Sequence, residues 1–185
     1  MLPIGQLMIE HRLIERVIRL WEGLLDTAEE TRAVDVGLLA HGIDFMHTYA
    51  DRCHHGKEED ILFRDLKKKN LSLELARILR ELIDEHIISR NTIKELSCAR
   101  ERYIDKEKNA FNDILAALKV IVNLYPAHIQ KEDKRFFIPC MEYFTSQEKD
   151  AMIREFNEFN RNLIHEKYKS LVKELESAKG KGLKK

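Results

Sequence analysis

The chain has 185 residues, of which 44% are apolar and 35% are charged, a balance that suits one soluble domain with a substantial core. Lys plus Arg and Asp plus Glu number 32 each, so no basic excess indicates nucleic acid as a partner. No apolar run approaches the roughly 20 residues of a membrane span, and the N-terminus lacks a signal-peptide pattern. Three scattered cysteines, Cys53, Cys98 and Cys140, argue against a disulfide framework and favour the reducing cytoplasm.

Apolar residues at steps of three and four predict long amphipathic helices and no strand. Ser72 is expected to cap a helix, Pro126 to bend one, and Thr145 with Glu148 to form a capping box. A polar loop is expected at 29–32. The expected helices are Ile4–Thr27, Asp35–Lys69, Ser72–Tyr103, Asp105–Phe137 and Thr145–Ser177.

Short connections between long helices favour antiparallel neighbours, so the predicted fold is an all-α, up-down four-helix bundle. Residues 1–140 are expected to form the bundle. Residues 145–178 are expected to form an added C-terminal helix packed on the same domain, and residues 179–185 a basic tail.

One motif occurs twice in this pattern. His54 is followed four residues later by Glu58, and His128 by Glu132, so each pair shares one helix face and forms a metal half-site. Ile129 stands opposite His55, so the alignment selects His54 rather than its neighbour. The aligned pairs are His54/His128, Lys57/Lys131, Glu58/Glu132, Glu59/Asp133, Leu62/Phe136 and Phe63/Phe137.

A Glu-His pair precedes each half-site by a similar interval. His11, which follows Glu10, lies 43 residues before His54, and His86, which follows Glu85, lies 42 residues before His128. Two hairpins packed with approximate two-fold symmetry would bring four histidines and two carboxylates together in the bundle core.

Simpler explanations exist for each motif taken alone. A single histidine on an apolar face is usually a hydrogen-bonded core residue, and a single His-x3-Glu is a common side-chain pair within a helix. Two buried carboxylates, however, are costly without partners, and no comparable set of Lys or Arg shares the inward stripes. The doubled motif therefore predicts a dinuclear metal site. Imidazole and carboxylate ligands without thiolate suit Fe, Mn or Zn and do not separate them.

The motifs resemble those of the hemerythrin-like (HHE cation-binding) family over nearly the whole chain up to Phe137. The resemblance rests on His11, His54 with Glu58, His86, and His128 with Glu132. It implies a four-helix bundle that holds two non-haem iron ions joined by an oxo or hydroxo bridge, with Mn or Zn less expected. It also implies that both glutamates bridge the ions and that the four histidines are terminal ligands.

One position departs from the family pattern. Oxygen-carrying hemerythrins have a second histidine four residues after the one in the third helix, and here Arg90 stands there. Of about twelve coordination positions on two ions, about two would then stay open. Alternatively, His165 in the last helix is a candidate for the fifth ligand or for a partner of a ligand, with helix packing as its default role.

Other residues near the motifs have less specific expected roles. His47 and Asp51 are candidates to hydrogen-bond a ligand histidine or to be solvated. His55 and Glu59 are expected to point about 100° away from the site, with Glu59 pairing with Lys57 or Arg64. Three aromatic residues are expected to pack the core and exclude water: Phe63, Phe136 and Phe137.

Three functions are compatible with such a site. The first is binding of O2 for storage, delivery or sensing, although the residue at position 90 weakens this interpretation. The second is an oxidoreductase that reduces peroxide, O2 or NO, or acts in iron handling and stress repair, with a redox partner. The third is an iron-responsive interaction module. The expected ligand is a diatomic molecule or peroxide, with neither nucleic acid nor membrane involved.

Overall fold

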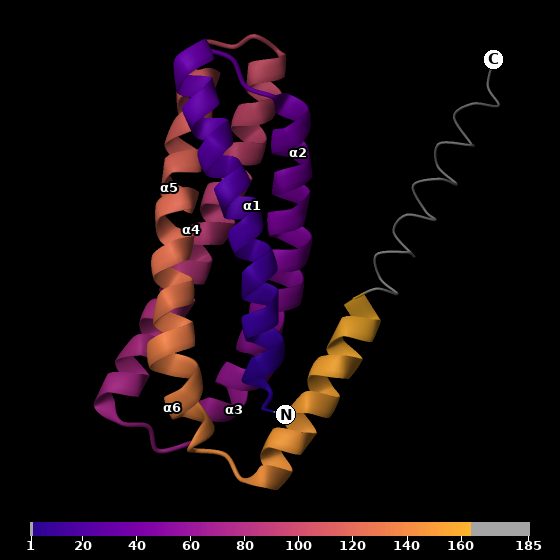
Figure 1. Ribbon diagram of the computed structural model, residues 1–185, viewed down its shortest axis with the longest axis vertical. Coiled ribbons are helices and arrows are strands. Elements are labelled where there is room, and N and C mark those ends of the chain that lie inside the picture. Colours follow the sequence, from indigo (N-terminus) through magenta and orange to yellow (C-terminus); the bar gives the residue numbers. More distant parts are fainter. Residues whose placement is uncertain (1, 164–185) are drawn as a thin grey trace, which may run out of the picture.

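The structure is a computed structural model that describes residues 2–163. The described residues are almost entirely helical and contain no strand. Four long helical runs lie side by side, namely α1 (Ile4–Thr31), residues 36–66, α4 (Leu73–Ile104) and residues 110–141 (Figure 1). The expected all-α bundle is confirmed.

Two of the four runs change their helical geometry along their length. Residues 36–66 comprise α2 (Val36–Phe45), η1 (Met46–His55), η2 (Glu58–Phe63) and α3 (Arg64–Leu66), and residues 110–141 comprise α5 (Ala110–Lys131), η3 (Glu132–Phe136) and α6 (Phe137–Met141). The three η segments are π-helical, with wider turns that are rare and often found at functional sites.

The π-helical segments follow the sequence repeat only in part. η2 begins at Glu58 and η3 begins at Glu132, which are aligned residues of the two half-sites. η1 has no such counterpart, because the equivalent part of α5 is regular α-helix. The repeat therefore extends to the backbone, with one asymmetric segment.

The four runs close a ring around the core. α5 packs against α1 and α4, and the α2–η1 run packs against α4 and α1. One apolar cluster surrounds Trp21 in one half of the bundle, and a second surrounds Phe63 and Phe136 in the other half. His11 lies between Leu7 of one cluster and Ile14 of the other, so the predicted site residues occupy the layer between the clusters.

Several predicted helix ends are confirmed, and others lie at different residues from those predicted. The Ser72 side chain accepts from the Leu75 N–H, and Thr145 and Glu148 form the predicted capping box. α1, however, continues through the expected loop at 29–32, because buried Ala28 anchors its last turn and Arg32 ends it in a left-handed conformation, with φ 59°. Asn109, with φ 67°, likewise delays the start of α5 to Ala110.

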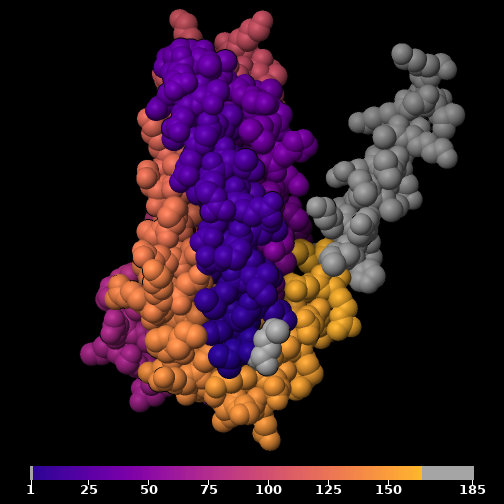
Figure 2. Space-filling model, viewed as in Figure 1, coloured from indigo at the N-terminus to yellow at the C-terminus, as the bar shows by residue number. Residues whose placement is uncertain are grey.

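A further helix, residues 146–163, packs beside the base of the bundle (Figure 2). Its Met152 and Phe156 are buried in the same cluster as Phe63. Polar contacts to the second run add to this packing: Arg64 pairs with Glu155, and the Cys53 thiol lies 3.4 Å from Asn160 Oδ1. The rest of the expected helix to Ser177, including His165, and the tail 179–185 lie outside the described residues.

Two features are absent from the part of the chain that the structure describes. None of its helices is long and apolar enough to cross a membrane. Cys53, Cys98 and Cys140 form no disulfide.

Gly42 tests the close packing between α1 and α2. A Cβ at this position would overlap the Trp21 indole, whereas a Cβ at exposed Gly23 on α1 would meet nothing within 4 Å. We expect Gly42→Ala to destabilise the fold by about 1–3 kcal/mol through overpacking. Gly23→Ala, the matched control, should stabilise it by roughly 0.5–1 kcal/mol through helix propensity. Thermal unfolding of both variants measures the difference, and equal melting temperatures would contradict this packing.

Candidate metal centre

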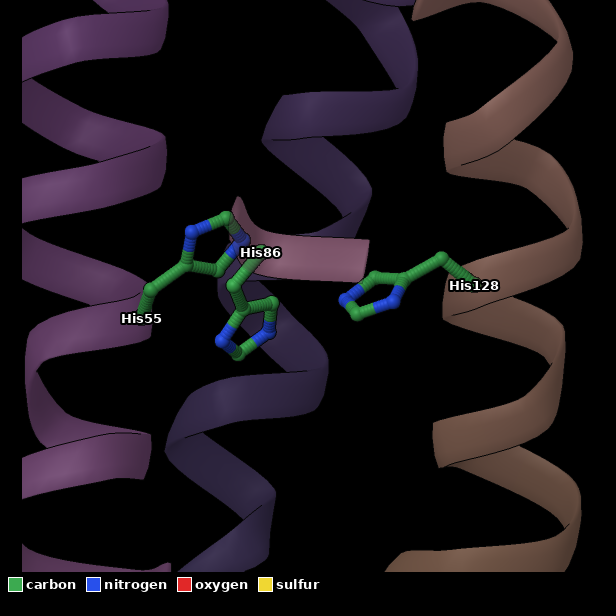
Figure 3. A group of neighbouring side chains, drawn as sticks. All are labelled: His55, His86 and His128. Atoms are coloured by element: carbon green, nitrogen blue, oxygen red, sulfur yellow. The ribbon is translucent and has the colours of Figure 1, made fainter. Parts of the chain in front are cut away.

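Seven buried side chains meet in the layer between the two apolar clusters. His11, His54, Glu58 and Glu132 form one group, and His55, His86 and His128 form another; within each group the candidate ligand atoms lie within 4.8 Å of one another. The three rings of the second group point toward one another from η1, α4 and α5 (Figure 3). None of the seven residues is more than 3% exposed.

The inward-facing atoms of these side chains lack hydrogen-bond partners. Among the described residues, the Nε2 atoms of all five histidines and both carboxylate oxygens of Glu58 and Glu132 are buried without one. Such orphaned atoms are rare in folded proteins because each costs desolvation energy. Their convergence is what a site for cations requires.

The outward-facing nitrogens of four of these histidines, in contrast, are satisfied by carboxylates. His11 Nδ1 lies 2.8 Å from Asp133, His54 Nδ1 2.9 Å from Glu10, His86 Nδ1 2.6 Å from Glu59, and His128 Nδ1 2.8 Å from Glu85. A carboxylate on the outer nitrogen fixes the ring orientation and leaves Nε2 free as a ligand atom, as is usual for metal-binding histidines.

These contacts obey the two-fold symmetry that the sequence repeat predicts. Glu10 binds His54 and Lys57, and the equivalent Glu85 binds His128 and Lys131. Phe137 stacks on His11 at 5.5 Å between ring centroids, and its counterpart Phe63 stacks on His86 at 5.9 Å. The expected packing role of the aromatic residues Phe63, Phe136 and Phe137 is confirmed, since all three are fully buried.

One buried lysine, Lys57, departs from the expectation that no set of Lys or Arg shares the inward faces of the helices. This lysine is fully buried on the inward side, although no such lysine was expected there. Its partner is Glu10 and not either of the two central carboxylates. Within the described residues, the ion pairs of Glu58 and Glu132 involve only histidines, so neither lysine nor arginine compensates the charges of these two glutamates.

The prediction that His55 points away from the site is wrong. Its ring is 1% exposed and stacks on His86 at 3.8 Å between centroids, and its Nδ1 lies 3.5 Å from Asp51. The physical reason is η1, whose wider turns end at His55 and present adjacent residues to the core. The adjacent pair His54-His55 was the only sign of this in the sequence.

Arg90 has a definite place in this arrangement. Its guanidinium donates to Asp51 at 2.6 Å and to Glu59 at 2.7 Å, so it links the carboxylates that face His55 and His86. Glu59 was expected to pair with Lys57 or Arg64 and instead contacts His86 and Arg90. Of the two candidates for contact with a ligand histidine, Asp51 faces His55, whereas His47 is exposed.

Burial sets the protonation of most of the histidines. Burial lowers the pKa of His54 well below its usual value, helped by the charge of His11, and burial lowers the pKa of His55 to about 3. Burial also lowers the pKa of His86. At His11 burial acts in the same direction, but the hydrogen bond to Asp133 and the nearby Glu132 carboxylate outweigh it and raise the pKa to about 9. Three imidazoles are therefore neutral at pH 7, the form that binds metal.

The two central carboxylates repel each other. Burial and the charge of Glu132 raise the pKa of Glu58 well above its usual range. At Glu132 burial acts in the same direction, but the surrounding histidines, His128 and His11 first, outweigh it and lower the pKa to about 2. The metal-free pair therefore retains a proton on Glu58 that a bound cation would displace.

The fold and the site together define a helical bundle with a buried histidine-carboxylate centre suited to cations. The family model of the hemerythrin HHE cation binding domain matches residues 2–138, and the chain belongs to this family. No match was found among curated proteins or among solved structures. The helix at 146–163 lies beyond the matched residues.

His55 can be tested against a histidine on the same π-helical segment. We expect His55→Ala to weaken binding of one cobalt(II) ion by about tenfold or more, equivalent to about 1.4 kcal/mol, because one inward imidazole is lost. His47→Ala, which removes an exposed imidazole from η1, should bind cobalt(II) as the wild type does. Titration followed by visible absorption measures both, and indistinguishable titrations would exclude His55 from the site.

Glu58→Gln tests the cost of the buried charge in the metal-free protein. A raised folded-state pKa means that wild-type stability falls as pH rises from about 4.5, the usual glutamate value, toward the folded pKa. The glutamine variant avoids this loss, so its melting temperature should exceed that of the wild type at pH 7, by about 2–4 °C for each kcal/mol at this length. The difference should shrink below pH 4.5, and a pH-independent difference would contradict the assignment. Added metal should stabilise only the wild type.

Proposed function

We propose that this protein binds two iron ions between the four helical runs and uses them to bind O2 reversibly, for storage, delivery or sensing. In this proposal Glu58 and Glu132 would be shared by both ions. His11 and His54 hold one ion, and the second is held by His55, His86 and His128. The observation that supports it is the set of orphaned Nε2 and carboxylate atoms that converge in a buried layer.

The number of histidines supports the O2-binding interpretation. The sequence suggested four histidines and about two open positions, and His55 adds a fifth imidazole within the site. Five imidazoles, two bridging carboxylates and one bridging oxygen leave about one open position of about twelve. The alternative is an oxidoreductase for peroxide, O2 or NO. Its support came from two open positions, and one of them is lost when His55 binds.

The donor set supports iron over softer metals. All candidate ligands are imidazole nitrogens or carboxylate oxygens. The nearest thiol in sequence, Cys53, faces Asn160 of the added helix. When bound, two ferrous ions supply the electrons and the open position that O2 binding needs. Manganese and zinc accept similar ligands, so metal analysis decides between them.

The protein's own residues orient the histidine rings and exclude water from the centre. Glu10 and Glu85 each bind one histidine and one lysine, so the rings are held from outside the centre. Phe63 and Phe137 stack against His86 and His11 and limit access of water on the side of the base. Excluding water in this way protects a reversible ligand from proton-driven side reactions.

One experiment separates the interpretations. Protein purified without added metal should contain about two irons per chain, and the reduced protein should gain a visible absorption band in air that disappears reversibly under vacuum. Irreversible oxidation with repeated consumption of peroxide would favour the oxidoreductase instead. A protein that holds zinc and no iron would contradict both.

A further inference from the structure

The covering helix, residues 146–163, packs on the first half-site from outside. Its Phe159 lies against Gly56, where an added Cβ would come within 2.7 Å of the ring. Its Phe156 lies beneath Lys57, with 5.9 Å between the ammonium nitrogen and the ring centroid. Gly56 and Lys57 fall within the first His-x3-Glu motif, so the helix covers the back of the segment that carries the two ligands of this motif.

Polar contacts fix the covering helix to two of the helical runs. The Gln6 side chain of α1 donates to Asn157 at 3.2 Å. The Cys53 thiol of the second run donates to Asn160 at 3.4 Å. These two runs supply the histidines of the first group of ligands, and the helix lies beside both of them at the base of the bundle (Figure 1).

The aligned residues of the second half-site are more exposed. The Lys57 side chain is 0% exposed and its partner Glu10 is 12% exposed. The equivalent Lys131 and Glu85 are 18% and 21% exposed, and Lys131 also pairs with Glu81 at the surface. The covering helix therefore makes the two halves of a symmetric centre unequal in their access to water.

This burial restricts the movement of one ligand histidine. A cation can leave the first half-site only if the His54 ring turns away from it. His54 Nδ1 lies 2.9 Å from Glu10, and Glu10 pairs in turn with Lys57. Because Lys57 is fully buried against Phe156, water cannot replace this pairing while the covering helix is docked. Undocking of the helix therefore has to precede release of the cation.

We propose that the covering helix is a metal-dependent lid. It retains the cation held by His11 and His54, and that cation in turn holds the helix against the bundle. The cation held by His55, His86 and His128 exchanges without movement of the helix. This inference rests on the proposed function for the presence of two cations, and it adds how their retention is controlled.

The physical link is the short segment between the two ligands of the first motif. A bound cation fixes His54 and Glu58, and thereby fixes Gly56 and Lys57, on which the covering helix packs. The cation and the helix therefore favour the same arrangement of this segment. Linkage makes the effect reciprocal: a helix that docks more tightly on the loaded site raises the affinity of that site by the same factor.

Phe159→Ala tests the lid, with Glu158→Ala as a matched control on the same helix. Phe159 is half-buried, whereas Glu158 is exposed. Protein loaded with two cobalt(II) ions is mixed with excess chelator, and the loss of visible absorption is followed. The wild type should release cobalt in two phases. Phe159→Ala should speed the slow phase at least about tenfold, because docking loses a phenyl ring, and should leave the fast phase unchanged. Glu158→Ala should match the wild type.

Thiol labelling tests the reverse effect in the wild type, so it does not depend on the folding of a variant. Cys53 is buried beside the covering helix, whereas exposed Cys98 serves as the reference. Labelling of each cysteine, resolved by mass spectrometry, should be at least about tenfold slower at Cys53 in the cobalt-loaded protein than in the metal-free protein, and unchanged at Cys98. Loaded Phe159→Ala should lose this protection of Cys53. Equal labelling of Cys53 in the loaded and metal-free wild type would overturn the lid.

The outcomes separate the lid from the proposed function. If the wild type binds fewer than two cations, the proposed function fails. If it binds two and releases them in a single phase, only the lid is overturned. The same holds if Phe159→Ala changes neither phase or speeds both phases equally.

Discussion

The structure depends on the burial of two carboxylates, Glu58 and Glu132, at the centre of a helical bundle. Neither has a hydrogen-bond partner among the described residues, and both are fully buried. Placing two like charges in such a layer is costly unless a cation joins them. The bundle is therefore less stable without metal, but its cation site is already formed. The family to which the chain belongs is a cation-binding one.

An outer ring of carboxylates surrounds this pair and orients the histidines around it. Glu10, Glu59, Glu85 and Asp133 each hold one histidine by its outer nitrogen, and lysine or arginine binds each of them in turn. Cations thus neutralise the outer ring and leave the inner pair uncompensated. The negative charge that attracts metal is therefore concentrated at Glu58 and Glu132.

Much of the fold and the inner site was predictable because both follow regular rules. Apolar steps of three and four predicted the four runs, and the repeat of His-x3-Glu predicted which residues converge. His55 was missed because α-helical spacing assigns it to another face, whereas η1 follows π-helical spacing. The burial of Lys57 was missed for a different reason: its partner Glu10 is 47 residues distant, and sequence spacing does not reveal such a pairing. The ends of α1 and α5 depend on single left-handed residues, Arg32 and Asn109, that no periodicity predicts.

The crossed hydrogen bonds of the outer ring have a consequence for assembly. Glu10 binds His54 within the first hairpin and Glu85 binds His128 within the second, but Asp133 reaches His11 and Glu59 reaches His86 across the hairpin interface. During synthesis the first hairpin emerges alone, and of His11 and His54 it can orient only His54 through a carboxylate of its own. The four carboxylate–histidine hydrogen bonds are all present only after the last helical run docks. Metal loading would therefore follow closure of the bundle and would hold the two hairpins together.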